Sequence, residues 1–79
     1  MRTQKQLQQR INTLNAIGVS FNRMSKDFGV SISLILKFSQ KPIHQYQAEL
    51  ATLRKIDDGV NRYISTLIEG FEGELHDNR

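Results

Sequence analysis

The sequence contains no cysteine, a single proline and five glycines, and it has no long hydrophobic run. The lack of cysteine excludes a disulfide scaffold, a zinc finger and a thiol nucleophile. No apolar stretch approaches the roughly 18 residues that a membrane-spanning helix needs, and the polar start of the chain is unlike a signal peptide. With 79 residues, 38% hydrophobic and 24% charged, we expect one mature cytoplasmic domain that is stabilised by packing or by a partner.

Charge is distributed unevenly along the chain, although the net value is only +3. Residues 1–55 contain nine lysines and arginines against two acids, whereas residues 56–79 contain two against six. A basic body suits an anionic partner such as nucleic acid, but a solvated surface accounts for the same charges equally well. Charge alone is therefore a modest indication of function.

Helical patterns dominate, because apolar residues recur at intervals of three and four rather than two. A first helix is expected over 4–17, where Thr3 and Gln6 form a capping-box signature. Second and third helices are expected over 21–28 and 32–39. Ser20 and Ser31 are suitable N-caps for these two helices. Gly18 and Gly29 are suitable residues to end the first and second helices.

The second half of the chain is less decisive. Pro42 fits the first turn of a fourth helix, whose apolar stripe would be Ile43, Tyr46, Leu50 and Leu53. At 57–59, Asp-Asp-Gly indicates either the aspartate cap of a fifth helix or a weak point in one long helix over 43–72. We expect a helical extension over about 57–72 and a frayed tail after it. The apolar residues of this extension would complete the core or pair with a second copy: Tyr63, Leu67, Ile68 and Phe71.

The stretch from Phe21 to Phe38 is the most specific part of the sequence. A helix-turn-helix needs a small residue where its helices cross, here Ser25, and a residue that tolerates the turn, here Gly29. It also needs apolar residues that hold the second helix on the first: Val30, Ile35 and Phe38. With these features, residues 4–55 resemble the lambda-repressor-like or Cro-like domains of phage regulators. The resemblance implies an all-α, compact bundle of four or five helices with a helix-turn-helix, and a role in transcriptional control.

The helix expected after Ser31 has two faces. A helical wheel places Leu34, Ile35 and Phe38 inward, and it places the remaining side chains outward: Ile32, Ser33, Leu36, Lys37 and Gln40. In DNA-reading relatives the outward face enters the major groove, where Arg or Lys reads guanine and Asn or Gln reads adenine. No such side chain stands in the first turn here, which does not favour sequence-specific DNA reading.

An outward face that contains Ile32 and Leu36 needs a physical reason, since exposing each one forgoes roughly 1.5 to 3 kcal/mol. Either the C-terminal helix covers this face, or the register differs, or a protein partner buries both residues. A protein-docking face would have Ile32 and Leu36 as anchors and a polar rim of Ser31, Ser33, Lys37 and Gln40. Such a domain is similar to the small temperate-phage antirepressors, or modulator-of-repression proteins. This resemblance implies binding to the DNA-binding domain of a repressor in the bacterial host cell.

The alternative is a Cro-like repressor that binds operator DNA directly. Its phosphate contacts would come from residues around the motif: Arg23, Lys26, Ser31, Lys37 and Lys41. The first helix adds Arg2, Lys5 and Arg10, for which solvated surface and phosphate binding are equally good interpretations. A domain that joins the repressor on DNA would combine both functions.

No pattern in the sequence indicates catalysis. His44 and His76 have no second histidine at a metal-binding spacing, and no glycine-rich phosphate loop is present. The neighbouring acids Asp57 and Asp58 are interpreted as a helix cap or turn. We therefore expect no enzymatic activity, no cofactor and no metal.

Overall fold

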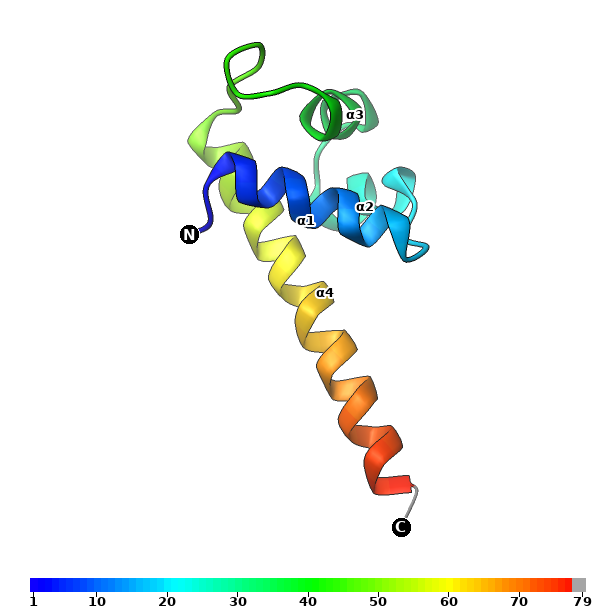
Figure 1. The fold of residues 1–79 in the computed structure, drawn as a ribbon. Coiled ribbons are helices and arrows are strands. Elements are labelled where there is room, and N and C mark those ends of the chain that lie inside the picture. Colours follow the sequence, from blue (N-terminus) through cyan, green and yellow to red (C-terminus); the bar gives the residue numbers. More distant parts are fainter. Residues whose placement is uncertain (78–79) are drawn as a thin grey trace.

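The computed structural model describes residues 1–77, with side-chain surroundings for residues 1–68. It is all-helical, as the sequence predicts, and residues 1–77 contain no strand. The four helices are α1 (Gln4–Ala16), α2 (Phe21–Phe28), α3 (Ile32–Gln40) and α4 (Leu50–Asp77). The first three gather around one half of α4, and the other half of α4 extends away from them (Figure 1).

Capping residues that the sequence predicts start the first three helices. The Thr3 hydroxyl accepts the Gln6 amide at 3.2 Å, and the Thr3 amide donates to the Gln6 side chain at 3.0 Å. Ser20 and Ser31 are the N-caps of α2 and α3. The hydroxyl of each serine accepts a hydrogen bond from the backbone amide three residues further on, at 3.1 Å in both helices. The observed bounds of α1, α2 and α3 consequently agree with the expected ones to within one residue.

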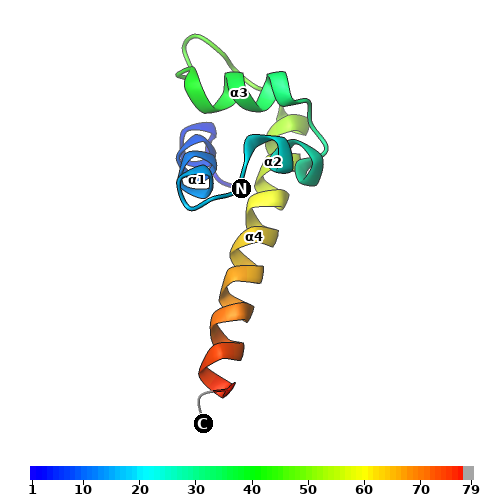
Figure 2. The same cartoon turned by 90° about the vertical axis from the view of Figure 1, so that its right-hand side faces the viewer.

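Every helix contributes an apolar stripe to one core, which lies where α1, α2 and α3 surround the upper part of α4 (Figure 2). Its buried members are Leu7, Ile11, Leu14, Met24, Phe28, Ile35, Phe38, Ile56 and Val60. Ile17, the last residue of the helix that the sequence predicts over 4–17, is 60% exposed. The reason is that α1 ends at Ala16 and Ile17 is its C-cap, so Ile17 no longer follows the helical stripe.

The expected fourth helix beginning at Pro42 is wrong. Residues 41–49 contain a single turn, in which the Gln45 and Tyr46 amides donate to the Pro42 carbonyl, and helix begins again only at Leu50. The buried Gln4 amide group fixes this connection: it donates to the Tyr46 carbonyl at 2.7 Å and accepts the Ala48 amide at 3.0 Å. These long-range hydrogen bonds satisfy the backbone of the segment without a helix.

A single helix, α4, runs through the Asp-Asp-Gly sequence at 57–59. Of the two alternatives for this region, one continuous helix is therefore confirmed and a separate fifth helix is not. Asp57 is not a cap: it is buried and accepts a hydrogen bond from the Arg2 guanidinium at 3.1 Å. Gly59 is not a break either, because it lies against the ring of Phe28, where an added Cβ would be 1.9 Å from Phe28 Cδ1. The glycine allows α2 and α4 to approach closely.

Beyond the core, α4 continues to Asp77, five residues past the expected end of the extension, so the backbone of residues 73–77 is helical where we expected fraying. Residues 78 and 79 lie outside the described residues. No helix within residues 1–77 has both the length and the apolar character needed to span a membrane.

The part of α4 that projects from the core carries apolar side chains without core contacts. Tyr63 and Ile64 still pack against the core, whereas Leu67 and Ile68 are 55% and 53% exposed. Of the two alternatives that the sequence left open, completion of the core is therefore wrong for Leu67 and Ile68, since α4 has passed the end of the bundle where they lie, and pairing with a second copy stays a prediction. The side chain of Phe71 lies outside the described residues.

Candidate docking face on helix α3

The turn between α2 and α3 determines how α3 is presented. Gly29 has φ 71°, a left-handed conformation that favours glycine, as expected for this position. The Ser25 hydroxyl donates to the Val30 carbonyl at 2.5 Å, and the Val30 amide donates to the Ser25 carbonyl at 3.1 Å. A larger residue than Ser25 would separate the helix from the turn, so the small size predicted for this position has a direct structural reason.

Packing fixes the inner side of α3 as the sequence predicts. Ile35 and Phe38 are fully buried, and Leu34 is half-buried against the core. Ser39 is buried too, and its hydroxyl is satisfied because it donates back to the Leu36 carbonyl at 2.8 Å. The rotation of α3 about its axis is therefore set, and its other side must face solvent.

Two side chains of α1 hold the C-terminal end of α3. The Gln8 amide donates to the carbonyls of Phe38 at 3.1 Å and Lys41 at 2.8 Å, and the Asn12 amide donates to the Ser39 carbonyl at 3.0 Å. Sequence reasoning missed both positioning residues. The available signal was that no glycine follows α3, which left its terminal carbonyls in need of side-chain donors.

The predicted docking residues come together on the outward side of α3. Leu36 is 38% exposed, and Ile32 is half-buried without belonging to the core cluster or its packed surroundings. Exposed polar residues surround these two: Ser31, Ser33, Lys37 and Gln40. We call these six residues the α3 face. Helix α3 lies at the end of the molecule opposite the projecting half of α4 (Figure 2). Five of the six residues of the α3 face are exposed, so no other part of the described chain covers the face.

The Lys37 side chain is exposed, but an aromatic ring restricts its position. Its ammonium group lies 5.2 Å from the centre of the Tyr46 ring, in a cation–π contact. Tyr46 belongs to the connection between α3 and α4, where sequence reasoning expected a helix, so this contact was not predicted. The contact orients Lys37 toward the connection.

The five candidate phosphate contacts are all exposed, but they do not form one cluster. Ser31 and Lys41 are the N-cap and C-cap of α3 and therefore lie about 15 Å apart along the helix axis. The Ser31 hydroxyl already accepts the Leu34 amide, which leaves the backbone amides of the first turn as donors. Lys26 lies near the C-terminal end of α2.

Arg23 points away from this group, toward α4. Its Nε atom lies 3.6 Å from the Asp27 carboxylate, and it lines a groove of about 240 Å³ between α2 and α4. In this groove the Tyr63 hydroxyl donates to the Asp27 carboxylate, and Arg62 donates to the Asp27 carbonyl at 2.7 Å. Burial, and then the hydrogen bond to Asp27, raise the pKa of Tyr63 above its ordinary value of 10.0. Asp27 thus joins α2 to α4, and Arg23 lies beside it in the groove.

Within the described part of the chain, no three histidine, cysteine, aspartate or glutamate residues lie close enough to hold a metal ion. No protein-family model, no curated protein and no solved structure matches this sequence. The features of the described residues that bear on function are therefore the geometry of the α3 face and the charge around it.

Proposed function

We propose that this protein is a helix-turn-helix regulator of transcription, with a lambda-repressor-like arrangement of α1, α2, α3 and the start of α4. The support for this identity is local: the left-handed turn at Gly29, the contact between Ser25 and Val30, and the buried Ile35 and Phe38 that fix the second helix on the first. Such a regulator would act in the cytoplasm of a bacterial host cell.

Its proposed mechanism is antirepression: the α3 face docks on the DNA-binding domain of a repressor and changes the access of that repressor to its operators. The observation that carries this proposal is the composition of the α3 face. Its first turn offers Ile32 and Ser33 where a base-reading helix needs arginine, lysine, asparagine or glutamine, and Leu36 stands exposed at its centre. An apolar centre with a polar rim is typical of a protein interface.

Titration of the purified protein with its cognate repressor domain tests this proposal. Leu36→Glu should weaken the complex at least about 30-fold, because truncating or charging a central anchor costs about 2 kcal/mol or more. Leu67→Glu is the matched control: it makes the same substitution at a leucine that is 55% exposed on the projecting half of α4. Equal affinities for the wild type and Leu36→Glu would refute docking through α3.

The alternative is a Cro-like repressor that binds operator DNA through α3. The observation in its favour is the exposure of Lys26 and Lys41 near α3, together with the nine basic residues among the first 55. Operator binding by this route should fall steeply with salt and should be lost in Leu36→Glu, which puts a negative charge against the groove. Binding to a repressor without a preference for its operator over an unrelated duplex, measured with the same preparation, would favour the antirepressor.

A further inference from the structure

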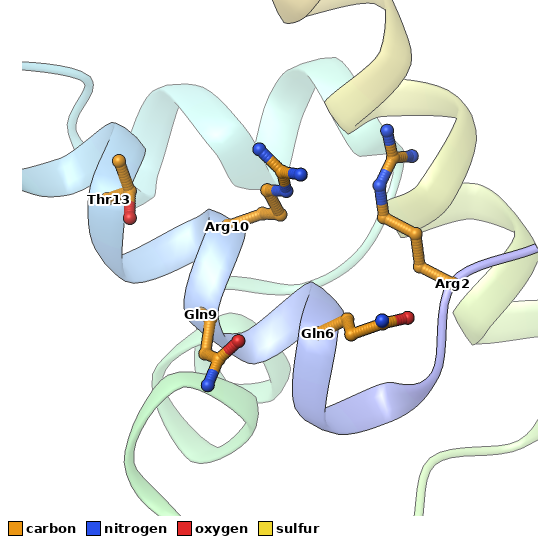
Figure 3. Close-up of a pocket in the computed structure, with 5 residues that line it drawn as sticks. All are labelled: Arg2, Gln6, Gln9, Arg10 and Thr13. Carbon is orange, nitrogen blue, oxygen red and sulfur yellow. The ribbon is translucent and has the colours of Figure 1, made fainter.

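Helix α1, together with Arg2 just before it, presents a second surface that antirepression through the α3 face does not use. Five residues line a shallow cavity of about 350 Å³ on the solvent side of the helix (Figure 3): Arg2, Gln6, Gln9, Arg10 and Thr13. We call this set the α1 face. Every member carries a hydrogen-bond donor at the end of its side chain, and none of them is acidic or apolar.

The α1 face lies on a different side of the bundle from the α3 face. Gln8 and Asn12 are the α1 residues that bind α3, and Arg10 is two positions from each of them, about 200° around the helix. Arg10 therefore points away from α3, and a ligand on the α1 face would leave the α3 face accessible.

The α1 face carries a net positive charge. The first 26 residues of the chain contain five basic residues and no acid. Arg2 is already neutralised, since its guanidinium binds Asp57 at 3.1 Å and Asn61 at 2.6 Å. Arg10 makes no ion pair and no hydrogen bond to another side chain among the residues the structure describes. It is the free cation of this surface, with the two glutamine amides and the Thr13 hydroxyl beside it.

The chemistry of the α1 face indicates the class of ligand. A protein partner needs an apolar centre to bury, and no residue of this face supplies one. The phosphate backbone of nucleic acid needs none: it is bound by arginine, glutamine and threonine side chains of this kind. From Gln6 to Thr13 the face extends about 10 Å, which spans two or three phosphates of one strand at about 3.4 Å of duplex axis each.

We propose that the α1 face binds the phosphate backbone of duplex DNA without reading its sequence. The α3 face stays free, so the protein would contact DNA through α1 while it contacts another protein through α3. This inference does not depend on the proposed function, because DNA binding through α1 holds whether or not α3 docks on a repressor.

Fluorescence anisotropy with a labelled duplex of about 20 base pairs, at salt concentrations between about 50 and 200 mM, tests this inference on the full chain. Two variants probe the face: Arg10→Gln removes its free cation, and Gln9→Glu places a carboxylate beside it. Lys55→Gln is the matched control, on an exposed position of α4 that does not line the cavity. All three variants lower the net charge by one, so a general charge effect is the same in each, and circular dichroism checks that each one is folded.

Arg10→Gln should weaken binding about three- to tenfold at low salt and reduce the slope of log K against log salt by about 0.9, as expected for one lost phosphate contact. Gln9→Glu should weaken binding similarly, and Lys55→Gln less than about twofold. Equal losses in Arg10→Gln and Lys55→Gln, or no binding by the wild type at about 50 mM salt, would overturn the proposal.

Two further measurements distinguish phosphate binding at the α1 face from binding at the α3 face and from binding of an acidic protein. Leu36→Glu should keep duplex binding even where it loses the repressor, and a loss of duplex binding in that variant would place the DNA on α3 instead. Unlabelled duplex should displace the probe, whereas polyglutamate at the same charge concentration should not. Equal displacement by polyglutamate would identify an acidic protein surface as the ligand and refute binding specific to phosphate.

Discussion

Glycine 59 gives the sharpest test of the packing between α2 and α4. In an ordinary helix interior, Gly→Ala raises stability by about 1 kcal/mol, because alanine has the better helix propensity. Here a new Cβ would lie 1.9, 2.3 and 2.9 Å from three carbon atoms of the Phe28 ring. That ring is only 4% exposed and makes an edge-to-face contact with Tyr63, at a centroid distance of 6.0 Å, so it has little room to move.

We expect the steric cost to exceed the gain in helix propensity. Overpacking a core costs about 1 to 3 kcal/mol, and three close contacts with a confined ring place Gly59→Ala at the upper end of that range. The net result should be a loss of about 1 to 2 kcal/mol, after the propensity gain of about 1 kcal/mol is subtracted. For a domain of this size each kcal/mol lowers the melting temperature by about 4 to 8 °C.

Thermal and urea unfolding followed by circular dichroism measure this effect. Asp58→Ala is the control, because it adds helix propensity at the adjacent exposed position without meeting another side chain. Gly59→Ala combined with Phe28→Leu should recover stability relative to the sum of the two single changes, since a shorter side chain leaves space for the methyl group. A Gly59→Ala variant as stable as the wild type would show that the close approach of α2 and α4 is wrong.

Two further predictions concern the connection at residues 41–49 and the groove between α2 and α4. Gln4→Ala should lose about 2 kcal/mol, because it leaves the Tyr46 carbonyl and the Ala48 amide without partners, and limited proteolysis should then cut residues 41–49 faster. Tyr63 binds its proton more tightly in the folded state, so stability should decline as pH rises above its ordinary pKa of 10.0. Tyr63→Phe should decline less over that range in urea titrations.

Each of these two predictions has an outcome that contradicts it. Gln9→Ala, at an exposed position of the same helix, should change stability by less than about 0.5 kcal/mol. If Gln4→Ala had an equally small effect, the hydrogen bonds of Gln4 would not be what holds residues 41–49 in place. Parallel pH profiles for the wild type and Tyr63→Phe would mean that the hydrogen bond to Asp27 does not favour the protonated hydroxyl.

Local signals in the sequence were sufficient for the first three helices. Thr3, Ser20 and Ser31 determine where those helices begin, because each satisfies an amide a few residues further on. The turn at Gly29 and the two faces of α3 follow from equally local chemistry and periodicity. The sequence therefore predicts which residues share the outward side of α3, whereas their role in docking stays a prediction.

The remainder depends on contacts between distant residues, which no local pattern reports. Pro42 is a sound helix start in isolation, but the Gln4 side chain satisfies the following backbone from 42 to 44 residues away. Gly59 signals a helix end unless Phe28 is known to lie against it. The sequence groups Arg23 with the lysines around α3, although its side chain pairs with Asp27 and lines the groove between α2 and α4.

The hydrogen bonds of the N-terminal segment have a consequence for synthesis of the chain. Gln4 and Arg2 are translated first, yet their partners Tyr46, Ala48 and Asp57 are translated 42 to 55 residues later. The α2–α3 unit can form early because its contacts are local, and α1 can join it once residues 38–41 have emerged. Until α4 follows, the core lacks Ile56 and Val60, and a nascent chain stalled before α4 would be open to chaperones and proteases.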